Sequence, residues 1–453
     1  MSEGEASHDV SAVVNVPLSD TAAIRFVGFS AKDGGFIDNV FGVSPRFGYK
    51  NNAGKEQKDF NEVNVSGGRV SARFFPNDDW TVTAGVVYQK TESDGRPEQD
   101  PTVGELQVVR FNPEHEFDNQ DWTQYSLTFE GDLGFANFVS ATSYFERDWT
   151  YHQDTTTYAS AFGIYCYGGH YDADGYWVYY VGGYSRYCFQ PAGVGNYYNE
   201  PVGYLENVQN NKKLSQEFRL SAKGEKADWV VGAFYEKSKE RWDFSTWTDG
   251  YGTSQAAANY ESGRLWWSGF CGSLPATKEE CLVPVDPNND LWWFSADRTE
   301  WETKALFGEV TVHVNDKLDA TFGGRWFERT MDKVYWVNQP APPNFRASDG
   351  TRGTGVIDVT GDDEDFFPKF SLKYQVNDDV MVYGLYSEGF RPGGTNRARG
   401  TPFFPASFSS DILENTEFGL KTTLANGRVR LNATYYDMSW DDYQLEVVDP
   451  SNV

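Results

Sequence analysis

A period of two in hydropathy is the feature of this chain that most constrains its fold. From Gln124 to Glu130 the odd positions are apolar and the even positions are polar. A strand places successive side chains on opposite faces, so this pattern is typical of a strand between two different environments. The same alternation recurs in segments that are far apart in the sequence, at residues 80–86, 217–223, 309–314 and 318–326. The chain therefore predicts an all-β fold whose strands have one apolar and one polar face.

The connections between these strands alternate between very short and very long. The short ones, such as 315–317 and 425–427, are rich in turn-forming residues. The long ones cover residues 33–61, 91–121, 149–213, 242–301, 334–364 and 392–410. Structureless loops beyond about 15 residues are uncommon in compact soluble domains, whereas outer-membrane barrels have short periplasmic turns and long extracellular loops. The asymmetry predicts an antiparallel transmembrane β-barrel of the outer-membrane type.

Counted in this way, the chain offers about fourteen strands of roughly ten residues, the length that crosses a bilayer at the usual tilt. Their expected starts are residues 10, 22, 62, 80, 122, 136, 214, 228, 302, 318, 365, 380, 411 and 428. We expect an apolar set to share the outward face: Tyr125, Leu127, Phe129, Phe218, Leu220, Ala320, Phe322, Phe418 and Leu420. A charged set should point inward: Glu217, Arg219, Asp319, Arg325, Glu417 and Lys421. Five tryptophans near strand ends should lie in an interfacial girdle: Trp80, Trp122, Trp229, Trp326 and Trp440.

Charge and motifs limit the function. The chain has 39 basic and 66 acidic residues, a formal net charge of -27, which argues against nucleic acid as a partner. The acidic run 362–365 is expected in a solvated loop, with divalent-cation binding as the alternative. The five histidines are scattered, and neither a Gly-x-Ser-x-Gly elbow nor a phosphate loop occurs. We therefore expect no enzyme, no bound cofactor and no resident metal, with His313 facing the lumen beside a polar neighbour.

Four cysteines fall as two pairs inside two of the long loops. Cys166 and Cys188 lie in one loop, and Cys271 and Cys281 lie in the next. This spacing suits local disulfides in an oxidising compartment. Neither pair has Cys-x-x-Cys spacing, and His170 is the only histidine near them, so zinc is not expected.

Three segments near the C-terminal end resemble motifs of the TonB-dependent outer-membrane receptors. Residues 383–391 are similar to the family's Tyr-x-x-Tyr-Ser-x-Gly-Phe-Arg strand end. Residues 414–421 look like its strand that ends in Glu-x-Gly-x-Lys, and residues 430–444 match what usually follows. The likeness runs over nearly the whole chain. It implies active uptake, in which a scarce ligand binds extracellular loops and a plug, and TonB displaces the plug.

The resemblance also implies parts that this sequence does not show. Family members carry a signal peptide, a TonB box and a globular plug inside a barrel of 22 strands. Residues 1–453 are therefore expected to be part of one barrel domain without a plug, covering approximately the second to fifteenth strands. The implied partners are outer-membrane lipid and lipopolysaccharide, the TonB complex through the missing plug, and a small-molecule or oligosaccharide ligand.

The resemblance leaves the ligand open among ferric siderophores, cobalamin and oligosaccharides, with iron-siderophore uptake favoured. Arg391, Asn396, Arg397 and Arg399 stand where the family's strand meets a loop near the binding vestibule. An arginine there could pair with an anionic chelate. The alternatives are loop solubility and contact with lipopolysaccharide.

The two long loops that carry the cysteines are also rich in aromatic residues. Tyr179, Tyr180, Trp266 and Trp267 are candidates for an aromatic platform that receives a ring-bearing ligand, either a sugar or a catecholate-type chelate. Rigid rings with a polar atom make good contact surfaces at low entropic cost. The alternative is that these rings pack loop on loop.

Two other function classes remain. A passive porin would share the strand and loop asymmetry but would lack the motifs at 389–391 and 414–421. A secreted all-β carbohydrate-binding protein or enzyme would need connections of similar length on both edges of its sheet.

Overall fold

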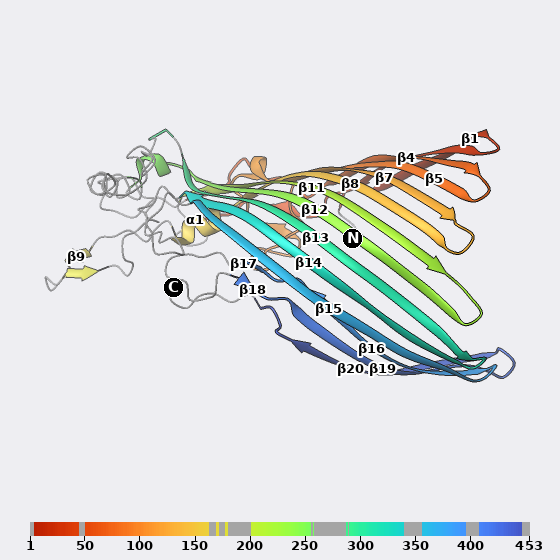
Figure 1. The fold of residues 1–453 in the computed structure, drawn as a ribbon. Helices are drawn as coiled ribbons and strands as arrows, with labels where there is room; N and C mark the ends of the chain where they lie inside the picture. Colours follow the sequence, from red (N-terminus) through yellow and green to blue (C-terminus); the bar gives the residue numbers. More distant parts are fainter. Residues whose placement is uncertain are drawn as a thin grey trace.

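Fourteen long strands form one antiparallel sheet in the computed structural model (Figure 1). The structure describes residues 4–44, 50–162, 169–171, 177–179, 201–254, 257, 287–288, 290–338, 356–395 and 407–445. The strands are β1 (His8–Ser19), β2 (Ala22–Asp33), β4 (Val63–Asn77), β5 (Trp80–Ser93), β7 (Phe117–Asp132), β8 (Asn137–Asp154), β11 (Gly203–Ala222), β12 (Ala227–Thr248), β13 (Leu291–Asn315), β14 (Leu318–Asn338), β15 (Val356–Asn377), β16 (Val380–Arg391), β19 (Asp411–Leu424) and β20 (Val429–Asp441). Each pairs with its neighbours in that order, and β1 and β20 form the two edges of the curved wall.

Short turns join the strands at one end of the wall and long connections join them at the other (Figure 1). The turn after β19 shows why the short ones are so tight. Ala425, Asn426 and Gly427 have φ values of 53°, 55° and 83°, a left-handed conformation that glycine and asparagine tolerate best. The predicted fold class is confirmed: the protein is an all-β, next-neighbour antiparallel wall.

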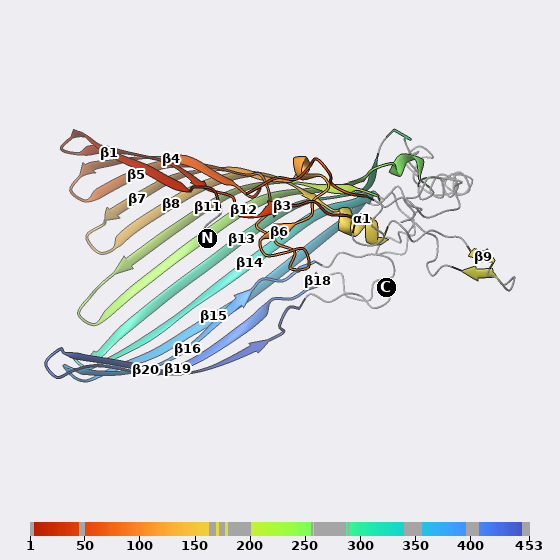
Figure 2. The same ribbon diagram turned by 180° about the vertical axis from the view of Figure 1, so that it is seen from behind.

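The remaining elements are short and lie toward the end with the long connections (Figure 2). They are β3 (Asp38–Asn39), β6 (Gln107–Val108), η1 (Pro113–His115), α1 (Thr156–Phe162), β9 (Gly169–Tyr171), β10 (Trp177–Tyr179), η2 (Tyr251–Thr253), β17 (Gly394–Thr395) and β18 (Ser407–Phe408). No helix in the described part of the chain is long and apolar enough to cross a membrane.

The described parts of the connections after β2 and β5 fold together into one compact unit, which we call the loop module (residues 34–44, 50–62 and 94–116). β3 and β6 pair in parallel within it. Two buried asparagines hold its backbone: Asn39 Nδ2 donates to the Lys55 carbonyl at 2.8 Å, and Asn52 Nδ2 donates to the Arg110 carbonyl at 3.1 Å. Buried amides that are fully paired in this way fix a loop as firmly as a small core does.

Several strands extend further toward the long connections than the alternation predicts. β11 begins at residue 203 instead of 214, β13 at 291 instead of 302, and β15 at 356 instead of 365. These extensions carry polar residues on both faces, so they lack the period of two that marks a strand in contact with lipid. The acidic run 362–365 lies in such an extension, opposite residues 327–330 of β14. The expectation that this run lies in a loop was therefore wrong.

The strand register puts the expected apolar residues on one face. Directly opposed residues of an antiparallel pair share a face, and one row runs across nine strands: Phe74, Val82, Phe129, Ser140, Phe218, Ala233, Leu306, Trp326 and Phe366. Side chains in this row are widely exposed, for example Phe218 at 49% and Leu306 at 58%. So large an apolar band is stable only against lipid. The charged set, from Glu217 to Lys421, lies on the opposite face, as predicted.

The aromatic girdle was only partly predicted. Trp80, Trp229 and Trp326 lie on the outward face. Trp122 lies an odd number of residues from the outward-facing Phe129, and Trp440 lies an odd number from the outward-facing Tyr435. Both rings are therefore on the inward face. Sequence position near a strand end does not determine which face a ring takes.

Replacing Phe218 with arginine should destabilise the inserted barrel by about 2–4 kcal/mol, because a basic side chain on the lipid-facing surface loses its hydration. The matched control is Ser221→Arg on the inward face of the same strand, which should have a far smaller effect. Urea unfolding of the intact protein from lipid vesicles measures both. Equal destabilisation by the two variants would contradict the assignment of faces.

Candidate functional site

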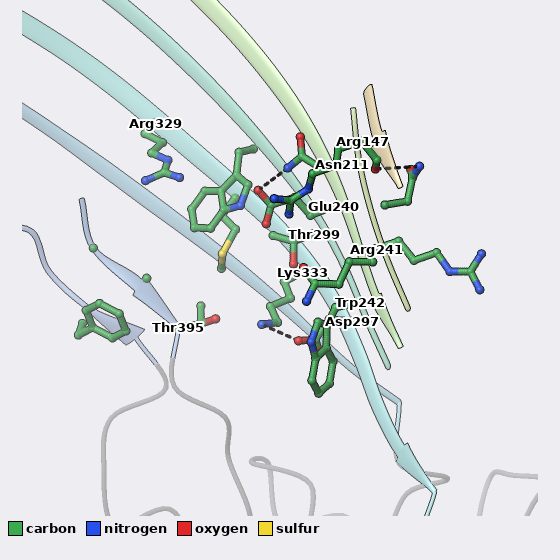
Figure 3. Close-up of a pocket in the computed structure, with 17 residues that line it drawn as sticks. Arg147, Asn211, Glu240, Arg241, Trp242, Asp297, Thr299, Arg329, Lys333 and Thr395 are labelled. Atoms are coloured by element: carbon green, nitrogen blue, oxygen red, sulfur yellow. Dashed lines mark hydrogen bonds and ion pairs between the residues drawn. The ribbon is translucent and has the colours of Figure 1, made fainter. Parts of the chain in front are cut away.

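A recess of about 540 Å³ opens on the inward side of the wall, between the strand extensions and the β17–β18 hairpin (Figure 3). We call it the wall recess. Strands β8 and β11–β14 supply Arg147, Asn211, Trp301, Arg329 and Lys333, and the hairpin supplies glycine backbone and a phenylalanine ring on the other side. The recess exists because the extensions continue the inward face beyond the lipid band, where charged side chains can keep some water.

Two arginines of the recess lie against indole rings. The guanidinium of Arg329 is 3.7 Å from the centre of the Trp301 ring, and that of Arg147 is 5.2 Å from the centre of the Trp149 ring. Such cation–π contacts hold a guanidinium in place without neutralising it. Among the described residues neither arginine has a carboxylate within ion-pair distance, and the Nε of Arg147 is buried without a hydrogen-bond partner.

The other polar groups of the recess have partners of different kinds. Lys333 Nζ is 3.3 Å from an oxygen of Asp297, and Asn211 donates to Glu240 at 3.2 Å. Asp297 therefore has a cationic partner and Glu240 has neutral donors, whereas Arg147 and Arg329 keep donor capacity toward the cavity. The recess can bind an anion, and its indole rings offer flat surfaces to a ring-bearing ligand.

A smaller recess of about 240 Å³ adjoins the wall recess and shares Trp301, Arg329 and Met331 with it. Asp362 and Asp363 line its far side. No group of three or more histidine, cysteine, aspartate or glutamate side chains in the described ranges could hold a metal ion. The divalent-cation alternative for this acidic run has no structural support there.

Arg391 lies at the end of β16, close to the hairpin, and is committed to an ion pair. Its Nε and Nη2 donate to Asp411 Oδ2 at 3.0 and 2.6 Å, and Asp411 is 1% exposed. Its guanidinium also lies 5.5 Å from the Trp440 ring. These contacts fasten β16 to β19. A ligand-binding role for Arg391 stays a prediction.

Most other predicted site residues lie outside the described residues. These are Asn396, Arg397, Arg399, Tyr180, Trp266, Trp267 and the four cysteines Cys166, Cys188, Cys271 and Cys281. Tyr179 ends the short strand β10, which pairs with β9. The disulfide pairing and the aromatic platform therefore stay predictions. His313 does face inward beside polar partners, 2.8 Å from Asp319.

Some rings of the long loops can be located, and they pack on one another. Trp292 is buried with Tyr251, and its ring lies 6.5 Å from that of Tyr158. Farther along the rim Trp247 stacks on Tyr204 at 5.1 Å. These rings pack on one another: Trp292 of β13 packs with rings of α1 and η2, and Trp247 and Tyr204 are opposed residues of the neighbouring strands β12 and β11.

The loop module reaches the wall through stacked rings that the sequence did not reveal. His115 of η1 stacks on Tyr204 at 4.4 Å with the planes 4° apart, and Phe117 stacks on His152 at 4.2 Å. Rings from η1 and from the three neighbouring strands β7, β8 and β11 thus meet in one column. No short motif marks them, because they come together only through cross-strand register.

Glu116 joins the loop module to the strands and is 3% exposed. Its Oε1 lies 2.8 Å from Arg110 Nε and accepts a hydrogen bond from the Asp154 amide at 3.0 Å. Burial raises the pKa of Glu116 in spite of the neighbouring guanidinium. A raised pKa means that the folded module favours the neutral form of Glu116. The free energy that this neutral acid contributes to docking is therefore complete below the ordinary pKa of a glutamate, and it is lost as pH rises through the raised pKa.

We therefore expect the amides of residues 110–112 to lose hydrogen-exchange protection as pH rises from below 4.5 into the neutral range. Glu116→Gln should remove that dependence, because its side chain is neutral at every pH. Comparing the two proteins at each pH cancels the intrinsic pH dependence of exchange. Parallel curves for the two proteins would show that Glu116 does not titrate at the docking surface.

The sequence profile described as "TonB dependent receptor-like, beta-barrel" matches residues 169–453, well over half of the chain. Similar solved structures include the ferric yersiniabactin uptake receptor FyuA from Yersinia pestis, 14% identical with a TM-score of 0.63 over 98% of this chain and 55% of that chain. The ferric-catecholate import receptor Fiu from E. coli K12, in its closed form, is 12% identical with a TM-score of 0.54 over 97% and 58%. The siderophore receptor PiuA from Acinetobacter baumannii is 11% identical with a TM-score of 0.52 over 95% and 55%.

The chain spans little more than half the length of these receptors. At such identities the likeness shows a shared fold. The sequence profile and the next-neighbour wall with one apolar face agree with it. The chain belongs to the TonB-dependent receptor-like β-barrel family, whose barrels lie in the outer membrane of bacteria.

Proposed function

We propose that the protein takes up an anionic metal chelate of the ferric-siderophore class across the outer membrane in a TonB-dependent manner. The wall recess is part of the path by which the ligand is captured. The observation that carries this proposal is the pair Arg147 and Arg329, two guanidinium groups held against indole rings with no carboxylate of the described residues within ion-pair distance. The structural relatives named above include receptors for ferric yersiniabactin and for a ferric catecholate.

Arginine suits this role because its planar fork of donors matches the paired oxygens of a carboxylate or catecholate. The pre-positioned guanidinium loses little entropy when it binds, since the indole already limits its rotamers. The formal net charge of the whole chain is -27, so an anion finds few such places on it. Local cationic groups therefore favour an anionic ligand over a neutral sugar at this position.

Residues 1–453 would then form wall and capture loops of one barrel domain. Transport also needs a plug that TonB can displace, which we assign to other parts of the intact protein. Lipopolysaccharide and outer-leaflet lipid would contact the exposed apolar band. Nothing in this division of roles requires catalysis.

The proposal is tested by the binding of iron-55-labelled ferric tris-catecholate to chilled cells that express the intact protein. We expect saturable binding that the matching gallium chelate displaces. If these cells bind no more chelate than control cells, but do bind cobalamin or an oligosaccharide, the ligand class is wrong.

A further inference from the structure

The wall recess has two sides, and one of them is the β17–β18 hairpin. Gly393, Gly394, Thr395 and Phe408 line the recess from this side. Among the residues that the structure describes, the hairpin has two paired positions, Gly394 with Phe408 and Thr395 with Ser407. An isolated two-stranded hairpin is marginally stable at best, so contacts with the rest of the wall help to set where it lies.

The legs of the hairpin meet very closely at its base. A Cβ atom on residue 393 would lie 2.4 Å from the carbonyl oxygen of Phe408, so only glycine fits there. Asp363 of β15 fastens this point, because its Oδ2 accepts hydrogen bonds from the Gly393 amide, at 3.1 Å, and from the Ser410 hydroxyl.

Gln444, which follows β20, also forms hydrogen bonds at the base of the β17–β18 hairpin. The two N–H groups of its side-chain Nε2 are shared among three backbone carbonyls on the two legs: Arg391 at 3.3 Å, Pro392 at 3.1 Å and Ser409 at 3.1 Å. Its backbone oxygen accepts from Arg391 Nη2 at 3.0 Å. One amide side chain therefore bridges the two legs.

We infer that Gln444 and Asp363 are positioning residues that hold the β17–β18 hairpin as the second side of the wall recess. Retention of the ligand in the recess would then depend on a residue that lies beyond β20 and does not line the recess. The consequence for binding rests on the proposed function, whereas the position of the hairpin does not.

The test compares Gln444→Ala with a matched control, Gln375→Ala. Gln375 also donates its side-chain amide to two backbone carbonyls, those of Asn377 and Val380, but at the short turn between β15 and β16 at the opposite end of the wall. Gln444→Glu is the second variant, because it keeps the size of the side chain and removes the donors.

The first readout is the distance between spin labels on Ser407 of the hairpin and Leu306 of β13, measured by double electron–electron resonance in the intact protein. Labels on genetically encoded keto residues avoid the native cysteines. We expect a narrow distribution in the parent and in Gln375→Ala, and a broad one in Gln444→Ala and Gln444→Glu. A distribution that stays narrow in both Gln444 variants would overturn the positioning role.

The second readout is the dissociation rate of ferric tris-catecholate. The loss of shared hydrogen bonds at the base should speed dissociation about tenfold in Gln444→Ala, with the melting temperature unchanged and with no effect in Gln375→Ala. A broad distribution without faster dissociation would show that the hairpin is not a side of the binding recess. If the parent binds no chelate, the proposed function fails, and the spin-label distances alone decide the positioning role.

Discussion

Replacing Arg147 and Arg329 together with glutamine is expected to lower the affinity of the intact protein for ferric tris-catecholate by about a hundredfold. Each hydrogen bond to a charged group is worth about 1.5–3 kcal/mol, and every 1.4 kcal/mol is a factor of about ten in affinity. Glutamine keeps a polar side chain of similar length but removes the charge and the fork of donors. Equilibrium binding on isolated outer membranes measures the change.

The matched control is Arg325→Gln. Arg325 lies on the same strand and the same inward face as Arg329, with its guanidinium 5.5 Å from the Phe234 ring, but it does not line the wall recess. Its replacement should leave the affinity within about twofold of the parent, since no ligand contact is lost. If Arg325→Gln weakens binding as much as the double variant does, the effect is the general charge of the lumen and not the recess.

Replacing Arg391 with alanine is expected to destabilise the protein by about 3 kcal/mol or more, because the removal of one partner leaves a buried charge uncompensated. The carboxylate left behind is that of Asp411, which is 1% exposed and would keep only backbone donors, from residue 391 at 3.1 Å and from Gln444 at 3.4 Å. Thermal unfolding of the inserted barrel, followed by its heat-dependent mobility on gels, measures the loss.

The double variant Arg391→Ala with Asp411→Asn separates the two roles considered for Arg391. A neutral amide needs no counter-charge, so the double variant should recover much of the stability. If chelate binding recovers with it, Arg391 acts only as a fastening of β16 to β19. If stability recovers and binding does not, Arg391 contacts the ligand directly. An Arg391→Ala protein as stable as the parent would contradict the importance of the ion pair.

The lipid-facing part of the wall could be predicted from the sequence because one physical rule governs it. Residues 318–326 alternate strictly, since one face meets lipid and the other meets polar groups, and the register places them as expected. The turn at 425–427 was also predictable, because a left-handed conformation demands residues such as asparagine and glycine. Local chemistry determines these features.

The strand extensions could not be predicted, because they carry polar residues on both faces and do not alternate with a period of two. The run 362–365 therefore looked like a loop, although it pairs with β14 and supplies the carboxylate of Asp363 that fastens the hairpin. Strand length above the membrane depends on pairing with a neighbour that is distant in sequence, which leaves no periodic signal.

The candidate site was largely beyond sequence reasoning for the same reason. Arg147 and Arg329 lie far apart in the sequence and come to the same recess only through four consecutive strand pairings. The sequence identifies Gln444 only as the last residue of a family motif, because no local sequence pattern indicates that a side-chain amide bridges two distant backbone segments. The motif that contains Arg391 pointed to the correct end of the wall but not to the recess itself.

Accumulation of iron-55 from ferric tris-catecholate, compared in cells with and without TonB, tests the central claim most directly. Both strains would express the intact protein at equal surface levels, and surface binding would be subtracted. We predict that cells of both strains bind the chelate and that only those with TonB accumulate iron. Equal accumulation without TonB would contradict active uptake and would mean that the barrel conducts its ligand passively.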